Sequence, residues 1–214
     1  SLLVMMGLLS MGTAAVFIIG QRDFKRMLAY SSVEHMGILA LGVGLGPAGA
    51  FAALLHMLNN GLTKGVLFLS AGNIHRAFGG KTMDHARGAL RRAPISATLF
   101  LLGFVAITGS PPFGPFVSEF SVLRAAVDGG RLGVAVGFVG LLAVIFIGMA
   151  TTVLSVVYGV PDQEPKESVQ GDSPFMIAAP LVFMAAVVFL GVWLPGWLTS
   201  VLGDAAKLLG GGAS

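Results

Sequence analysis

The sequence lacks cysteine altogether and is poor in charge. Its 214 residues contain no cysteine, which excludes disulfides, thiolate-bound iron–sulfur clusters and thiolate nickel centres from this chain. Charged residues make up only 11%, against about 25% in soluble domains, so polar groups are too few to cover a water-facing surface. Phosphate-binding, dinucleotide-binding and hydrolase motifs are also missing. We therefore do not expect a soluble domain, and any redox reaction linked to this chain must occur in another subunit.

Long apolar stretches dominate what is present. Hydrophobic residues make up 55% of the chain, and they fall in stretches of roughly 18 to 25 residues, enough to cross a hydrocarbon core about 30 Å thick. Inside a bilayer the backbone must satisfy its own hydrogen bonds, which favours helices. The sequence therefore predicts an all-α integral membrane protein with six transmembrane helices, at residues 2–20, 27–45, 48–78, 94–127, 132–158 and 174–194.

The fourth predicted helix is too long for one straight span. Its 34 residues would measure about 51 Å as a continuous helix, against an apolar core of about 30 Å. Two consecutive prolines near its middle, Pro111 and Pro112, remove amide donors and push the preceding residue out of helical geometry. We therefore predict that this helix is broken at the Pro-Pro pair, and that the irregular backbone is shielded by protein or lines a wet cavity.

Loop charges predict the orientation in the membrane. The loops at residues 21–26, 79–93 and 159–173 would share one face, which carries nine lysines and arginines, whereas the other face carries Arg131 and Lys207. Positive residues concentrate in cytoplasmic loops, so both termini of this chain are predicted on the non-cytoplasmic side of the inner (cytoplasmic) membrane. The nine residues are Arg22, Lys25, Arg26, Arg76, Lys81, Arg87, Arg91, Arg92 and Lys166.

The chain divides into three parts by this pattern. Residues 1–159 form a five-helix unit, residues 160–173 a polar cytoplasmic linker, and residues 174–214 a final transmembrane helix with a short amphipathic tail. The chain starts within a span, without a methionine and without the basic segment of a signal peptide. We therefore expect a fragment or a processed product.

Polar residues inside the spans are the candidate functional groups, because they are costly in a membrane. The third predicted helix carries His56, Asn60 and Lys64 at intervals of four residues, so they share one face over about 12 Å. Lys64 lies far from either end, and it must pair with an acid or give up its proton. Either condition suits proton transfer. The alternative is a structural lysine held by carbonyl groups or by a static ion pair.

Glu119 is the second candidate, just beyond the predicted break. Freed backbone groups and water near the break would let a carboxyl group there alternate between its protonated and ionised forms. The alternative is a structural ion pair with an arginine such as Arg124, although a spacing of five residues is poor helical geometry.

The second predicted helix offers Glu34 and His35, about one-third along the span from its cytoplasmic end. They would hand protons from Lys25 and the cytoplasm toward Lys64. A structural hydrogen-bonded cluster with the neighbouring hydroxyl groups is the alternative. His75 and His85 lie near or in the basic loop, where we expect them to be solvated.

No cofactor and no metal ion are predicted. A haem between His35 and His56 would require both residues at the same depth beside a flat apolar slot, and nothing in the sequence demands this. Histidines and carboxylates also lack the pairwise spacing of a metal-binding motif.

Three motifs carry a family resemblance. Residues 23–37, DFKRMLAYSSVEHMG, resemble the signature D-x-K-R-x-x-A-Y-S-S-x-x-H-M-G of the antiporter-like subunits of complex I, Mrp-type cation/proton antiporters and membrane-bound nickel–iron hydrogenases. Residues 56–69 are similar to the family's H-x-x-x-H-x-x-x-K-x-x-L-F, and residues 109–120 to its G-x-P-P-F…S-E-F. The order of the three motifs is that of the family, the resemblance covers essentially the whole chain, and its details most resemble the F-type component of hydrogenase-4.

The resemblance implies a fold and a set of roles. The family has fourteen helices with two inverted five-helix repeats, each with a broken fourth helix; this chain resembles the second repeat plus the last span, the carboxy-terminal half. By the same resemblance Lys64 takes the central proton-relay position, His56 the connecting histidine, and Glu119 the terminal charge of the broken helix. Asn60 stands where many members have histidine, so a relay there would need ordered water.

We therefore expect a proton-translocating membrane subunit driven by redox chemistry elsewhere in a hydrogenase or complex I-like (NADH-quinone) complex. It would belong to an oxidoreductase complex without redox centres of its own. Expected partners are the other membrane subunits, the lipid bilayer and the transported ion, which is the proton or, as an alternative, Na⁺. A Na⁺/H⁺ antiporter module and a non-pumping structural or assembly subunit are the alternatives. Nucleic-acid binding is not expected, because the net charge of +3 is carried mostly by loops.

Overall fold

The structure is a computed structural model that describes residues 1–21, 23–78, 87–160 and 171–210. Within these ranges all regular structure is helical, as predicted. The nine helices of the described residues are α1 (Leu2–Ile18), α2 (Phe24–Gly44), α3 (Pro47–Ala77), α4 (Ala89–Arg92), α5 (Pro94–Ile107), α6 (Gly114–Asp128), α7 (Leu132–Tyr158), α8 (Pro174–Val192) and α9 (Gly196–Gly210).

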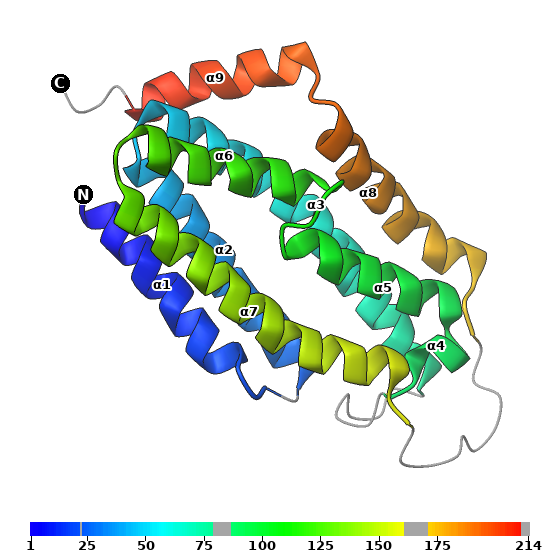
Figure 1. Cartoon of the computed structure of the whole chain (residues 1–214). Coiled ribbons are helices and arrows are strands. Elements are labelled where there is room, and N and C mark those ends of the chain that lie inside the picture. Colours follow the sequence, from blue (N-terminus) through cyan, green and yellow to red (C-terminus); the bar gives the residue numbers. More distant parts are fainter. Residues whose placement is uncertain (22, 79–86, 161–170, 211–214) are drawn as a thin grey trace.

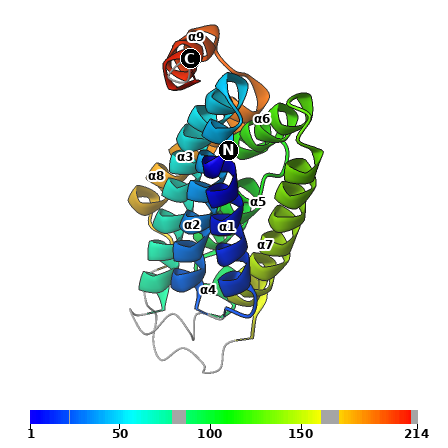
Figure 2. The same cartoon turned by 90° about the vertical axis from the view of Figure 1, so that its left-hand side faces the viewer.

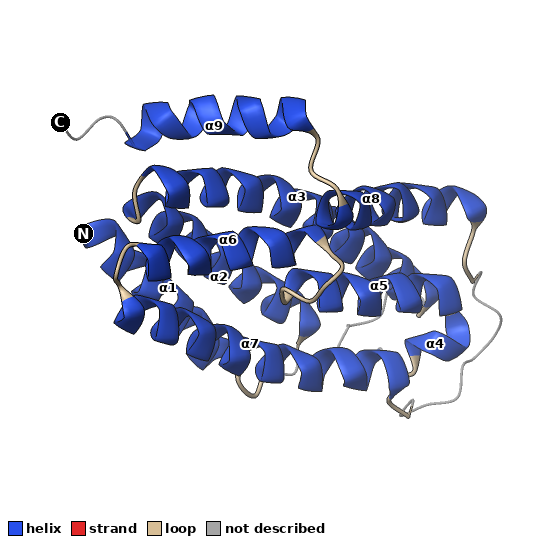
Figure 3. Cartoon of the chain, turned by 45° about the horizontal axis from the view of Figure 1, so that its top comes forward, coloured by secondary structure: helices blue, strands red, loops and turns tan. Residues whose placement is uncertain are grey.

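Helix α3 lies at the centre of the bundle. It packs against α2, α5, α6, α8 and α9, while α1 and α7 pack on each other beyond α2 (Figure 1). Helices α5 and α6 follow one another along the bundle, joined by an irregular segment (Figure 3). A polar side chain on α3 can therefore contact several helices at once, which matters for the site described below.

The two ends of the bundle are distinct. The N-terminus and α9 lie at one end and α4 at the other (Figure 2). At the α4 end the Asp172 carboxylate accepts a hydrogen bond of 2.8 Å from the Ile95 amide, which ties the start of α8 to the start of α5. At the opposite end the side chains of Ser1 and Arg131 both donate to the Gly44 carbonyl, at 3.1 and 3.4 Å. The described parts of the three basic loops thus share one end, as expected.

Most of the described basic residues gather at the α4 end. They are Lys25, Arg26, Arg76, Arg87, Arg91 and Arg92. Arg22, Lys81 and Lys166, which belong to the same predicted face, lie outside the described residues, as does most of the predicted linker at 160–173. Arg124 lies near the α9 end, exposed and paired with Asp128 at 3.3 Å, so that end carries one more arginine than the sequence count gave it.

The break predicted in the fourth span is confirmed. Helix α5 ends at Ile107 and α6 begins at Gly114, and both prolines lie between them. The irregular backbone retains local hydrogen bonds, among them those from the Ser110 amide to the Val105 carbonyl (3.3 Å) and from the Phe113 amide to the Ser110 carbonyl (3.2 Å).

Helix α8 covers this break. A methyl group added at Gly191 would overlap the Pro112 carbonyl oxygen and lie 2.8 Å from the Gly114 amide nitrogen. Only a glycine lets the two backbones approach so closely. Protein therefore covers the irregular segment on its α8 side, as the sequence predicted, whereas Pro111 and Pro112 are exposed.

Two of the described helices, α7 and α8, are long and apolar enough by length and composition alone to cross a membrane, and α1 and α5 are apolar but shorter. The difference from the six predicted spans has a physical reason. Helices α2 and α3 carry buried polar side chains that lower their hydropathy, and the break divides the fourth span into helices of 14 and 15 residues.

The C-terminal tail forms a longer helix than expected. Helix α9 has 15 residues and crosses the end of the bundle against α3 (Figure 1). Leu198 and Ala206 are buried, whereas Trp197, Val201 and Leu208 are exposed.

Candidate functional site

The close packing of α2 against α3 sets the position of the central polar groups. A turn at Gly46, with φ of 94°, reverses the chain between the two helices. Next to this turn a methyl group at Gly42 would lie 2.9 Å from the Gly49 carbonyl oxygen. The backbones are therefore as close as glycine allows, and the antiparallel register brings His35 of α2 beside His56 of α3.

His56 joins three helices. Its Nε2 lies 2.9 Å from Nδ1 of His35, and its Nδ1 lies 2.9 Å from the Ser118 hydroxyl of α6. All three side chains are fully buried. A neutral imidazole donates at one nitrogen and accepts at the other, so the His56 ring can receive a proton on one side and release one on the other. These contacts link α2, α3 and α6 through His56, which is the geometry that its predicted connecting role requires.

Lys64 reaches α2 and not the broken helix. Its ammonium group donates to the Leu28 carbonyl at 2.9 Å and to the Ser31 hydroxyl. The side chain is 9% exposed. A structural lysine held by carbonyl groups was the alternative to a proton carrier. The contact with Leu28 fits that alternative, and the geometry is compatible with both roles.

Glu34 interacts electrostatically with both Lys64 and Glu119. It is buried, with 3% exposure, and it is near enough to attract the ammonium group of Lys64 and to repel the carboxylate of Glu119 when both carry charge. The acid and the base predicted to exchange protons therefore interact through a third titratable group on α2.

The carboxyl group of Glu119 packs against Gly109, at the start of the break. Gly109 has φ of 69°, and a methyl group there would be 2.9 Å from the carboxyl carbon of Glu119. The Oε1 atom is buried without a hydrogen-bond partner among the described residues. Arg124 instead pairs with Asp128 at 3.3 Å, so the expected alternative, an ion pair of Glu119 with Arg124, is wrong.

The neighbouring residues Asn59 and Asn60 of α3 differ in their contacts. The Asn59 amide donates to the Gly114 carbonyl at 2.8 Å and so holds α3 to the first turn of α6. Asn60 is buried, and its Oδ1 has no partner in the described part of the chain. The hydrogen-bonded side chains next to Lys64 and His56 therefore belong to α2, namely Ser31 and His35. Among the described residues, Asn60, which lies between Lys64 and His56 on α3, does not connect them.

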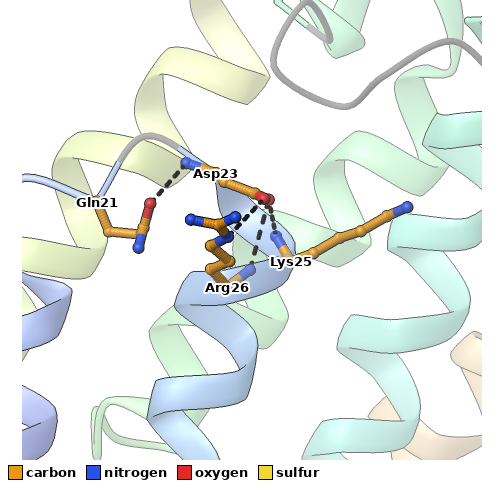
Figure 4. Close-up of polar contacts among 4 residues, drawn as sticks. All are labelled: Gln21, Asp23, Lys25 and Arg26. Carbon is orange, nitrogen blue, oxygen red and sulfur yellow. Dashed lines mark hydrogen bonds and ion pairs between the residues drawn. The ribbon is translucent and has the colours of Figure 1, made fainter.

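Lys25 lies apart from this cluster. The Asp23 carboxylate caps α2 by accepting from the amides of Lys25 (2.8 Å) and Arg26 (3.4 Å), and the Lys25 side chain extends away from it (Figure 4). Lys25 is exposed, nine residues before Glu34 on the same helix, which is about 14 Å along the axis. His75 lies near the end of α3, half-buried, and His85 lies outside the described residues.

The histidines lie at matching depth, yet they leave no haem slot. Their rings contact each other directly, with centroids 5.1 Å apart, so a porphyrin has no room between them. The fold instead gathers His35, His56 and Glu119, whose ligand atoms all lie within 4.8 Å of one another. Sequence spacing could not indicate this group, because each member comes from a different helix.

Ser31, Asn59 and Ser118 take part in the site although they were not among the predicted proton-relay residues. Their nearness in sequence to predicted residues was the one indication of a role. Ser118 precedes Glu119, Asn59 precedes Asn60, and Ser31 is three residues before Glu34. Their contacts cross between helices, so periodicity within one helix could not reveal them.

Comparisons with known proteins identify the family of the chain. The chain matches the family described as NADH:quinone oxidoreductase/Mrp antiporter, transmembrane, over residues 1–146. It is 36% identical over 197 residues to a hydrogenase-4 component F homolog of Methylacidiphilum infernorum, a match that covers 91% of this chain and 40% of that protein.

Solved structures agree with the fold. A chain of respiratory complex I from Thermus thermophilus matches with a TM-score of 0.79 and 29% identity, over 98% of this chain and 44% of that one. A chain of the Mrp complex from Dietzia sp. shares the fold with a TM-score of 0.80 and 22% identity, over 97% and 47% of the two chains. The chain thus spans less than half the length of each, and both are subunits of multi-subunit membrane complexes. The chain belongs to the NADH:quinone oxidoreductase/Mrp antiporter family and is an antiporter-like membrane subunit.

Proposed function

We propose that this chain conducts protons as the carboxy-terminal half of a pump subunit in a redox-driven membrane complex of the hydrogenase or complex I type. The observation that carries the proposal is the buried polar line across three helices, from Lys64 through Ser31 and Glu34 to His35, His56 and Ser118. Glu119 adjoins the far end of this line. Buried titratable groups are costly in a membrane, which favours a functional reason for gathering so many.

In this proposal six membrane crossings are formed by α1, α2, α3, the broken pair α5 and α6, α7, and α8. Residues 1–159 are the second inverted five-helix repeat, residues 160–173 a cytoplasmic linker, and residues 174–214 the last span and its tail. The basic α4 end faces the cytoplasm, in keeping with the positive-inside rule, and both termini of this chain face the other side. The partners are the membrane and redox subunits of the parent complex.

Proton movement follows the polar line. A proton from the cytoplasm passes by Lys25 to Lys64, which exchanges it with Glu34 and His35 and holds it until a charge change in a neighbouring subunit releases it. His56 then carries it to the level of Ser118 and Glu119, with ordered water completing the step near Asn60. Moving one charge against about 100 mV costs about 2.3 kcal/mol, which corresponds to a change of about 50-fold in proton affinity.

The test uses inverted membrane vesicles that contain the parent complex, with a chelator present to remove free metal ions. Redox turnover and pH-gradient formation are measured together for the wild type and for Lys64→Met. We expect turnover to continue while the gradient is lost. Lys207→Met is the matched control, because Lys207 is exposed on α9 and pairs only locally with Asp204 at 3.0 Å. A gradient equal to the wild type in Lys64→Met would instead support a structural or assembly subunit.

A Na⁺/H⁺ antiporter module is the second candidate, favoured by the Mrp members of the same family. In that case an imposed Na⁺ gradient would drive proton movement through the chain without redox turnover. Substituting K⁺ for Na⁺ in the same vesicles separates the two functions, because proton pumping by a redox complex does not need Na⁺.

A further inference from the structure

The cluster of His35, His56 and Glu119 has the ligand chemistry of a transition-metal site. Two imidazoles and one carboxylate form one of the known ligand sets of zinc sites that keep a fourth position open. Here the three ligand atoms lie within 4.8 Å of one another. Zn²⁺ takes its ligands at about 2.0–2.2 Å, which places tetrahedral ligand atoms about 3.3 Å apart. The most distant pair of ligand atoms would have to come closer by at most about 1.5 Å on binding.

Unpaired atoms in the cluster support the same interpretation. His35 Nε2 and Glu119 Oε1 are buried and have no hydrogen-bond partner within the described residues, and the two side chains are 0% and 5% exposed. A buried polar atom without a partner loses the free energy of hydration with no return. A bound cation would satisfy lone pairs in this group that the protein leaves unpaired.

Neighbouring groups hold the ligands in place. The Ser118 hydroxyl contacts His56 Nδ1 at 2.9 Å, the kind of outer contact that fixes the ring of a metal-binding histidine. Gly109 leaves room for the Glu119 carboxylate, and the carboxyl group of Glu34 lies near enough to interact electrostatically with it. Lys64 contributes an opposing positive charge.

We propose that His35, His56 and Glu119 bind a divalent transition-metal ion, with Zn²⁺ as the best-suited ion. Soft thiolate ligands are missing from the chain, and the nitrogen and oxygen ligand set suits Zn²⁺ better than Mg²⁺ or Ca²⁺. The assignment rests on this geometry and does not depend on the proton path. Because the same groups form that path, an ion bound there would also block it.

The test measures Zn²⁺ binding directly, without turnover. The full chain, purified in detergent without a polyhistidine tag, is stripped with chelator, dialysed against Zn²⁺, and analysed by mass spectrometry and zinc-edge X-ray absorption. We expect one tightly bound ion per chain with only nitrogen and oxygen ligands at about 2.0–2.2 Å. Equilibration will be slow, because the ligands are buried.

Variants locate the ion. His56→Gln and Glu119→Gln should weaken binding by about 10- to 100-fold or more, whereas Glu119→Asp, which keeps the carboxylate, should retain it. His75→Gln is the matched control on the same helix as His56 and should bind as the wild type. Far-ultraviolet circular dichroism identifies any variant that fails to fold. Failure of the folded wild type to bind, or equal binding by wild type and His56→Gln, would overturn the assignment.

Lys64→Met separates this inference from the proposed function. It should abolish the pH gradient in vesicles and yet bind Zn²⁺ at least as tightly as the wild type, because it removes a like charge near the ion. Loss of Zn²⁺ binding in this variant would contradict the site. An unchanged gradient would contradict the proton path and leave the metal result standing.

Discussion

At the scale of single residues, Lys64 holds α2 to α3 through the Leu28 carbonyl and the Ser31 hydroxyl. These contacts fit two roles of Lys64, a fixed positive charge and a proton carrier. Only a carrier must release the proton of its ammonium group. The guanidinium group of arginine stays charged at every physiological pH. An arginine at this position therefore preserves a fixed charge and abolishes a carrier.

We predict that Lys64→Arg loses most of the pH gradient in vesicles of the parent complex while redox turnover continues. The physical reason is that arginine keeps the charge but cannot release its proton. Lys207→Arg, on the exposed face of α9, serves as the control and should pump normally. Full pumping by Lys64→Arg would mean that the charge alone is needed, and the carrier role of Lys64 would be wrong.

Ser31→Ala should lower the free energy of unfolding by about 1–3 kcal/mol, because it removes a hydroxyl partner from a buried ammonium group. Ser32 is the matched control: among the described residues its hydroxyl bonds only the Leu28 carbonyl of its own helix, at 3.3 Å, so Ser32→Ala should change stability by less than about 0.5 kcal/mol. Thermal unfolding in detergent gives both values. Equal effects of the two substitutions would show that the contact of Ser31 with Lys64 contributes little.

At the scale of elements, the broken helix depends on α8. The irregular segment between α5 and α6 places Gly109 against Glu119 and the Pro112 carbonyl against Gly191. The segment is therefore positioned from two sides, and a change on α8 should be felt at Glu119 without touching that residue.

We predict that Gly191→Ala destabilises the chain by about 1–3 kcal/mol, because the added methyl group overlaps the backbone of the break and forces α8 outward. Gly203→Ala is the control within a helix, where a methyl group meets nothing within 4 Å. It should stabilise α9 by about 0.5–1 kcal/mol. Chemical denaturation compares the two, and a neutral Gly191→Ala would mean that the break and α8 are not in close contact.

The sequence predicted the elements better than their contacts. The Pro111–Pro112 pair located the break because proline acts on local backbone geometry, and it did so correctly. The contact of His35 with His56 depends instead on how closely α2 and α3 approach at Gly42 and Gly49. That approach is a property of two helices together, so spacing within one helix could not supply it.

At the scale of the whole molecule, the separation of charge between the two ends gives an orientation that experiment can check. The described basic residues gather at the α4 end, opposite the N-terminus and α9 (Figure 2). The natural absence of cysteine lets single cysteines report on each end without removing any native thiol.

We predict that Val160→Cys reacts with a membrane-impermeant maleimide only from the cytoplasmic side, and Ser200→Cys only from the opposite side. Both positions are exposed, Val160 after α7 at the basic end and Ser200 on α9. Neither substitution alters a lysine or arginine, so the charge difference that sets the orientation is preserved. Right-side-out and inverted vesicles of the parent complex provide the two directions of access, and detergent gives the total reactivity. The reverse pattern would place the basic loops outside, and proton uptake at Lys25 from the cytoplasm would then be impossible. Labelling of both cysteines from one side would instead mean that α8 does not cross the membrane between them.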